Sequence, residues 1–126
     1  MVLAGCSTGP KGPPSATVTK YKEWLGQYQV AMSSFTTHSQ AVDYLKTSAD
    51  CAELRTFADA GVLLPATANS NADGAWQAAM SALSDGVYTC ATGTNFRDAA
   101  AVTKAADIFS GVDDNLRIVR ANLPGS

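Results

Sequence analysis

The stretch from Tyr21 to Leu45, YKEWLGQYQVAMSSFTTHSQAVDYL, carries the clearest fold signal in the chain. Its large apolar side chains recur every three or four residues, which places them on one face of an α-helix. The members of this stripe are Tyr21, Leu25, Tyr28, Met32, Phe35, Val42 and Leu45. The pattern predicts a helix over residues 17–47. Whether it is continuous through 33–37 stays open, because the Ser and Thr side chains there compete for backbone hydrogen bonds and favour a bend or break.

A short second helix is expected directly after the first. Asp50 and Glu53 have the spacing of a capping box, so this helix is predicted to begin at Asp50. Gly61 is expected to end it in the left-handed conformation. Residues 65–74 are rich in Ala, Thr, Asn and Ser and are predicted to form a polar connector.

Two longer helices are expected in the second half of the chain. The third spans about residues 72–92, with an alternative in which a turn at Asp85-Gly86 leaves residues 87–91 irregular. Its apolar face carries Trp76, Met80, Leu83, Val87 and Cys90. The last helix is predicted to begin after an Asn95 cap and to run to about residue 121. Its apolar stripe is Phe96, Ala99, Thr103, Ala106, Phe109, Leu116 and Val119.

These four segments fit one domain of all-α class. The chain has 126 residues, of which 46% are hydrophobic and 16% charged, the size and balance of a single compact domain. Short connections make consecutive helices antiparallel. We therefore predict an up-down-up-down helical bundle of about four helices, the second one short, in a globular domain over residues 17–126.

The net charge of the chain argues against a nucleic-acid partner, and its hydropathy argues against a membrane-spanning helix. Nine basic residues against eleven acidic ones give a net charge of -2. Nucleic acid is therefore not an expected partner, because no broad basic face is available to neutralise phosphates. No apolar run approaches the roughly 18 residues that a membrane-spanning helix needs.

The first residues point to a location. Leu3-Ala4-Gly5-Cys6 resembles the lipobox of bacterial lipoproteins. The resemblance covers these four residues, and the family of the globular domain is not recognised. It implies that the Cys6 thiol receives a diacylglycerol and that a signal peptidase cleaves just before it. Residues 1–5 would then be the remnant of a signal peptide, and the protein would be extracytoplasmic and anchored to a bacterial membrane.

Residues 6–16 are expected to comprise the lipidated cysteine and a tether that joins it to the domain. This segment is rich in Pro, Gly and Ser and holds no side chain able to join a core. Lipobox, tether and globular domain follow one another in the order usual for exported lipoproteins. The lipobox and the tether therefore support each other's interpretation.

Cys51 and Cys90 remain once Cys6 carries a lipid. Two thiols in an oxidising compartment predict a disulfide between them, because a bridge persists there. Two free buried thiols, or a metal held by the pair, are the alternatives. In the predicted bundle the start of the second helix and the end of the third lie at the same end, where the two cysteines could meet.

The chain offers few groups for catalysis, cofactors or metals. His38 is the only histidine, and its helical neighbours place it at the edge of a packed stripe. Only Glu23 and Glu53 are available for a di-iron site of the kind that helical bundles build, and the C-x-x-C-H haem motif is missing. We expect no metal and no cofactor.

The carboxylates give no better catalytic candidate. Asp113 and Asp114, or Asp43 with Asp50, are the nearest pairs for acid-base work. A solvated helix surface, with Asp113 paired to Arg117 one turn on, is the simpler interpretation. We therefore expect no enzymatic activity.

The resulting hypothesis is a non-catalytic, lipid-anchored module that binds another protein of the cell envelope. The alternative is a small-ligand carrier with a pocket between its helices. Its groove would be lined by Trp24, Tyr28, Met32, Trp76 and Met80, because aromatic residues offer flat apolar faces with a polar handle.

Overall fold

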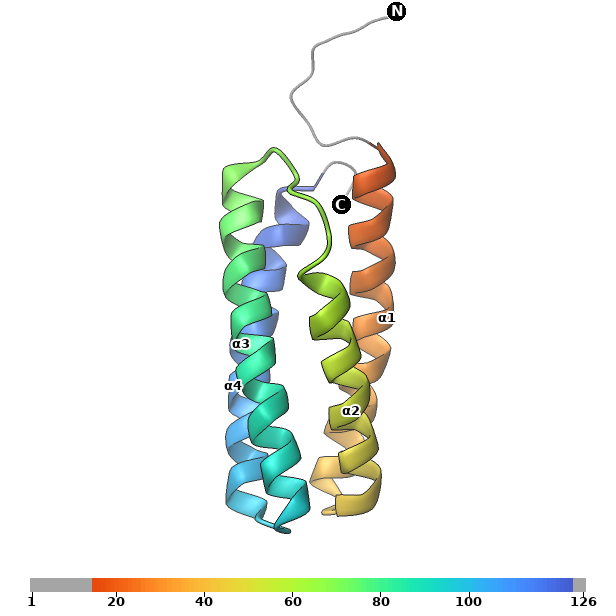
Figure 1. Ribbon diagram of the computed structural model, residues 1–126, viewed down its shortest axis with the longest axis vertical. Helices are drawn as coiled ribbons and strands as arrows, with labels where there is room; N and C mark the ends of the chain where they lie inside the picture. The colour runs from red at the N-terminus through yellow and green to blue at the C-terminus, as the bar shows by residue number, and fades with distance from the viewer. Residues whose placement is uncertain (1–14, 124–126) are drawn as a thin grey trace, which may run out of the picture.

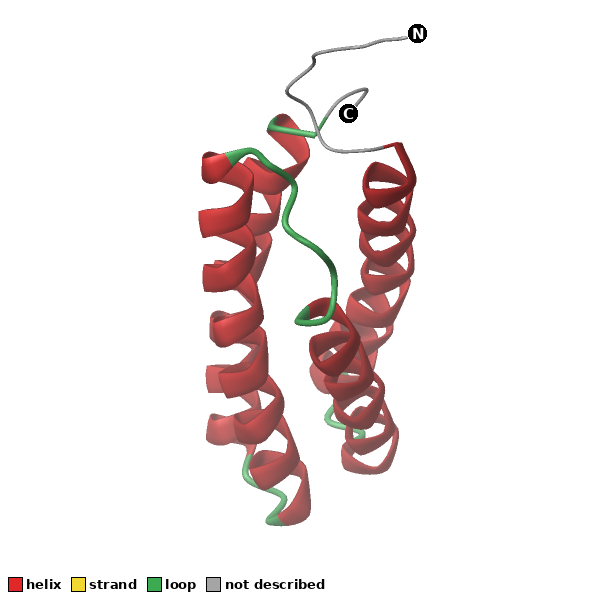
Figure 2. Ribbon diagram, turned by 45° about the horizontal axis from the view of Figure 1, so that its top comes forward, coloured by secondary structure: helices red, strands yellow, loops and turns green. Residues whose placement is uncertain are grey.

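The protein is described here by a computed structural model that covers residues 15–123. Four antiparallel helices make up a bundle, and the described residues contain no strand. The helices are α1 (Ser15–Gln40), α2 (Tyr44–Gly61), α3 (Ser70–Asn95) and α4 (Ala99–Ala121) (Figures 1 and 2). Each helix packs beside the next along the chain, and the contact is most extensive between α3 and α4. The first and last helices, α1 and α4, have the smallest contact. The predicted all-α, up-down-up-down bundle is thus confirmed.

The first helix begins and ends earlier than predicted. It starts at Ser15, so two residues assigned to the tether are helical, and it continues unbroken through residues 33–37. It stops at Gln40 instead of residue 47, because Val42 adopts a positive φ of 55° and turns the chain. The signal remnant 1–5, Cys6 and the tether up to residue 14 lie outside the described residues.

The second helix begins at a different aspartate from the one predicted. Asp43 is the N-cap, and its carboxylate accepts a hydrogen bond from the Lys46 amide at 3.0 Å. Asp50 lies inside α2, where its side chain contacts α1. The predicted capping box of Asp50 and Glu53 is therefore wrong.

The turn between α3 and α4 corrects the last predicted boundary. Asn95 ends α3, and Asp98 caps α4 by accepting from the Ala101 amide at 3.2 Å. Phe96 consequently lies in the turn with 77% of its surface exposed, off the apolar stripe. Helix α3 is continuous through Asp85-Gly86, which excludes the irregular alternative for residues 87–91.

Three helical glycines allow close packing. Gly61 is helical and not left-handed as predicted, and a Cβ there would collide with the Met80 sulfur. A Cβ on Gly86 would meet the Phe109 ring, and one on Gly93 would meet the backbone of Val102. Gly86 and Gly93 therefore explain why α3 and α4 approach so closely.

Aromatic side chains fill the space between α1, α2 and α3. Trp24 stacks on Tyr28 and meets Trp76 edge-on, both with ring centroids 4.8 Å apart. The indole nitrogens of Trp24 and Trp76 donate to the carbonyls of Phe57 and Gly61 at 2.9 and 3.0 Å. The indoles therefore have their polar groups satisfied while their rings are buried.

The predicted disulfide is confirmed. Cys51 of α2 and Cys90 of α3 are bonded, with their Cα atoms 5.8 Å apart and a separation of 39 positions in sequence. The antiparallel topology brings both to the half of the bundle that holds the α1–α2 and α3–α4 turns. Within residues 15–123, no helix combines the length and the hydropathy that a membrane span requires.

Candidate functional site

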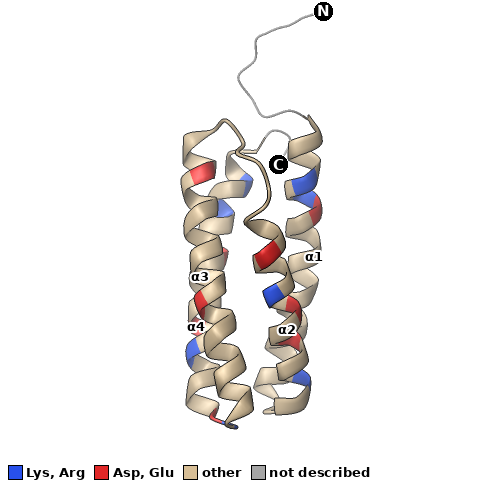
Figure 3. Ribbon diagram, in the orientation of Figure 1, with Lys and Arg blue, Asp and Glu red and all other residues tan. Residues whose placement is uncertain are grey.

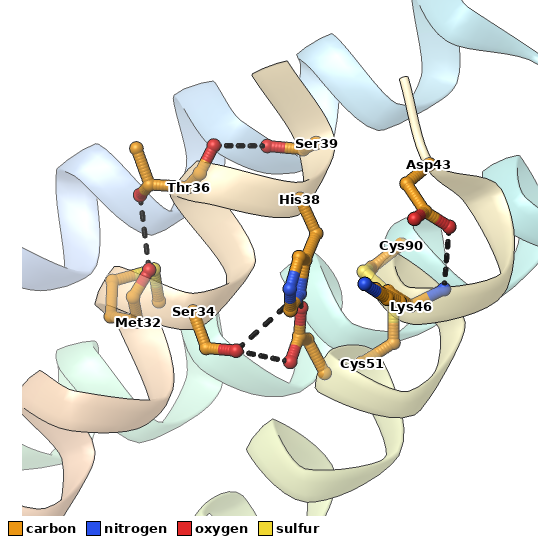
Figure 4. A network of polar contacts seen from close by, with 10 residues as sticks. Met32, Ser34, Thr36, His38, Ser39, Asp43, Lys46, Cys51 and Cys90 are labelled. Atoms are coloured by element: carbon orange, nitrogen blue, oxygen red, sulfur yellow. Dashed lines mark hydrogen bonds and ion pairs between the residues drawn. A yellow bond between two sulfur atoms is a disulfide. The ribbon is translucent and has the colours of Figure 1, made fainter. Parts of the chain in front are cut away.

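Polar side chains of α1 and α2 meet in a small network near the disulfide (Figure 4). One oxygen of the Asp50 carboxylate lies 2.6 Å from His38 Nδ1. Its other oxygen accepts a hydrogen bond from the Ser34 hydroxyl at 2.8 Å. Asp50 is 5% exposed, whereas the His38 side chain is 29% exposed. The network links α1 to α2 and accounts for the position of Asp50 inside the second helix.

This Ser34–His38–Asp50 network lacks the geometry of a nucleophilic triad. In such a triad the carboxylate binds one imidazole nitrogen and the serine hydroxyl binds the other. Here Ser34 Oγ lies 3.4 Å from Nδ1, the same nitrogen that Asp50 contacts. The serine donates to the carboxylate, so its hydroxyl is not activated by the imidazole. The sequence placed His38 at a packed edge but did not reveal its aspartate partner.

The carboxylate pair on α4 is arranged differently from the prediction. Arg117 pairs with Asp114 at 2.9 Å and not with Asp113. Asp113 is half-buried, and its pKa is raised by desolvation, an effect that Arg120 and Arg117 partly oppose. Tyr28 has no exposed surface, and its pKa is raised mainly by burial and further by the charge of Asp113.

The five residues of the predicted groove do not share one cavity. Trp24 and Tyr28 are 6% and 0% exposed and belong to the aromatic core, and Met32 packs against that core from a half-buried position. Trp76 and Met80 do line a depression beside α3, although each is almost wholly buried. The structure therefore retains two of the five residues at a surface groove.

That depression lies between α3 and the α2–α3 connection, and it adjoins a second depression between α2 and α3 to form a longer groove along α3. The half near the α2–α3 connection has a volume of about 430 Å³, and the half near the disulfide about 450 Å³. Ser84 lines both halves and joins them. We call the whole the α2–α3 groove. Small side chains make up much of its lining, among them Ser48, Ala52, Ala58, Ser81, Ser84 and Ala91.

Larger apolar and charged side chains also line this groove. Val62 and Tyr88 line it with 61% and 76% of their surface exposed. Arg55 and Asp59 line the half near the disulfide, and within residues 15–123 neither makes an ion pair. Acidic and basic positions are interspersed along α2 (Figure 3). The groove thus offers exposed apolar surface together with charges that have no ionic partner in the described chain.

Comparison with protein-family models, with curated proteins and with solved structures finds no match to this chain. Among the described residues no three His, Cys, Asp or Glu side chains are grouped so as to hold a metal ion.

Proposed function

We propose that the protein is a lipid-anchored, non-catalytic interaction module of a bacterial cell envelope, and that its α2–α3 groove receives an amphipathic helix of a partner protein. The groove carries this proposal. It runs along α3, bordered by α2 in one half and by the α2–α3 connection in the other, has a mostly apolar lining and leaves Tyr88 and Val62 exposed. An apolar groove between two helices is a common receptor for the apolar face of a third.

The length and charge of the groove define the partner. The α3 residues that line it extend from Asp73 to Ala91, about 27 Å at a rise of 1.5 Å per residue. A partner helix of about five turns would match that length. The small residues of the lining leave room for larger apolar side chains, and a carboxylate on the partner would pair with Arg55.

The anchor is supported by the sequence. Leu3-Ala4-Gly5-Cys6 resembles a lipobox, and a Pro-rich segment follows it. A disulfide between Cys51 and Cys90 suits an oxidising compartment, where such bridges persist. In this proposal the lipid on Cys6 holds the domain at a membrane surface, and the groove meets a partner in the same envelope.

Site-specific photo-crosslinking in the producing cells tests the groove. A crosslinker in place of Tyr88 is expected to capture one dominant protein, while the same group in place of Val30, exposed on α1, is not. Ser84→Arg should abolish capture because it fills the junction of the two halves. Ser110→Arg, an equal change on exposed α4 surface, should leave it intact. Identical adducts from both crosslinker positions would contradict the proposal.

The anchor has its own test. The intact mass of the protein from the membrane fraction should correspond to a chain that begins at Cys6 and carries a lipid. An unmodified chain with Met1 still attached would contradict membrane anchoring while leaving the crosslinking result unaffected.

A further inference from the structure

Most of the accessible residues that α2 and α3 contribute to the α2–α3 groove recur at alternating spacings of four and three. On α2 and its C-cap they are Ser48, Ala52, Arg55, Asp59 and Val62, and on α3 they are Gln77, Ser81, Ser84, Tyr88 and Ala91. A repeat of 3.5 residues is the spacing with which one α-helix packs along another. Both borders of the groove therefore have the side-chain spacing that an added helix requires.

The two charged residues on the α2 side of the groove identify the added helix. Arg55 and Asp59 are exposed, lie one helical turn apart, and make no ion pair within residues 15–123. A second α2 that ran antiparallel to the first, with a two-fold axis at Phe57, would place each Arg55 opposite the Asp59 of the other copy. A parallel arrangement would set arginine against arginine. The order of the charges fits a second copy of this chain, because a two-fold interface must be self-complementary.

The same antiparallel arrangement covers the exposed apolar residues of the groove. Ala52 would face Val62 of the second copy, since both lie five positions from Phe57 in sequence. Tyr88 lines the groove together with Ala52, so Val62 of the second copy would pack on both. Val62 and Tyr88 are 61% and 76% exposed in one copy. By symmetry, each copy would cover the apolar side chains that the other leaves exposed.

We propose that the α2–α3 groove is occupied by α2 of a second copy of this chain, in a two-fold dimer with reciprocal Arg55–Asp59 ion pairs. The length agrees, because the 18 residues of α2 extend about 27 Å, as the groove does. The carboxylate that Arg55 lacks in one copy is then supplied by the other. This inference rests on the proposed function, because it names the partner of the same groove.

Charge reversal tests the reciprocal ion pairs. The oxidised full-length protein, with the Cys6 thiol alkylated so that it forms no bridge between chains, is expected to sediment as a dimer. Arg55→Asp and Asp59→Arg should each weaken the dimer about tenfold or more, because two attractive contacts become repulsive. An equimolar mixture of these two variants should recover the wild-type affinity, since each contact across the axis again joins opposite charges. Lys104→Asp, an equal change on exposed α4 surface, should have no effect.

Three results of this experiment would overturn the dimer. One is a wild-type protein that stays monomeric at about 100 μM, far above the micromolar dissociation constant of a weak specific interface. Another is a pair of single variants that dimerise as tightly as the wild type. The third is a mixture that stays monomeric although circular dichroism shows both variants to be folded.

Photo-crosslinking in cells separates this inference from the proposed function. A crosslinker in place of Tyr88 should yield an adduct of two copies of this chain, joined near Val62 of the second copy. An adduct with a different protein would overturn the dimer and leave the proposed function intact. No adduct beyond that formed from the position of Val30 would contradict both.

Discussion

Val42 shows how one residue can end a helix against its own preference. Its φ is 55°, in the left-handed region that β-branched side chains rarely adopt. The backbone nevertheless closes the end of α1, with the Val42 amide donating to Ser39 at 3.1 Å and the Asp43 amide to His38 at 3.0 Å. The valine side chain is 59% exposed, so packing does little to offset the strain. Its conformation is one that glycine adopts without a steric penalty.

Val42→Gly should therefore stabilise the protein. We expect a gain of about 0.5–1 kcal/mol in the free energy of unfolding, because relief of the left-handed strain exceeds the extra freedom of glycine in the unfolded chain. Urea denaturation measures it. The control is Val30→Gly, an exposed valine within α1, which should lose about 1 kcal/mol because glycine weakens a helix interior. Losses of similar size in both variants would show that the turn is not strained.

At the level of the helices, the sequence determined the fold class and most of the elements but not every boundary. The apolar stripe continues past Gln40 to Val42 and Leu45, and the turn contains no Gly or Pro, so no local signal marks the end of α1. Asp43 and Asp50 are both suitable caps by composition. Asp50 instead contacts Ser34 and His38, which come close to it only when α1 and α2 pack together in the folded protein.

The candidate sites were less predictable than the fold. Helical periodicity shows which side of a helix faces inward, but not which neighbour covers it. The pattern therefore predicts Trp24 in a groove, whereas Trp76, Tyr28 and Phe57 enclose it in the core. The α2–α3 groove depends on the distance of α2 and of the α2–α3 connection from α3, which the pattern does not show. Pairing of the cysteines was predictable because topology places them at one end.

The contact between α3 and α4 can be tested with a matched pair of glycines. Gly86→Ala should destabilise the protein by about 1–3 kcal/mol, because a Cβ there enters the Phe109 ring in a packed core. Gly26→Ala, on α1, should instead gain about 1 kcal/mol, since no atom outside its own helix lies within 4 Å of the added Cβ and alanine favours the helix. Thermal unfolding compares the two. A stabilised Gly86→Ala variant would mean that α3 and α4 can separate at little cost.

Across the whole molecule, two kinds of link hold the helices in register. The disulfide joins α2 to α3 in the half nearer the α1–α2 and α3–α4 turns. At the other end, the Tyr21 hydroxyl donates to the Pro65 carbonyl at 2.6 Å and the Trp76 indole to Gly61, which ties the α2–α3 connection to α1 and α3. The short helix α2 is thus fixed at both ends, and with it the two sides of the α2–α3 groove.

Loss of the disulfide should lower stability without abolishing the fold. A bridge that closes a loop of this length, 39 positions in sequence, is worth about 4 kcal/mol in the chain-entropy model. The Cys51→Ala/Cys90→Ala variant should retain its helical circular dichroism at low temperature, because the aromatic core is untouched, but should unfold at lower urea concentration.

Reduced wild-type protein provides the comparison that separates the crosslink from side-chain packing. If reduced protein and the double variant unfold together, well below the oxidised form, the stabilisation comes from the covalent link. If reduction leaves the midpoint unchanged, the helix contacts alone hold α2 against α3, and the groove would persist in a reducing compartment.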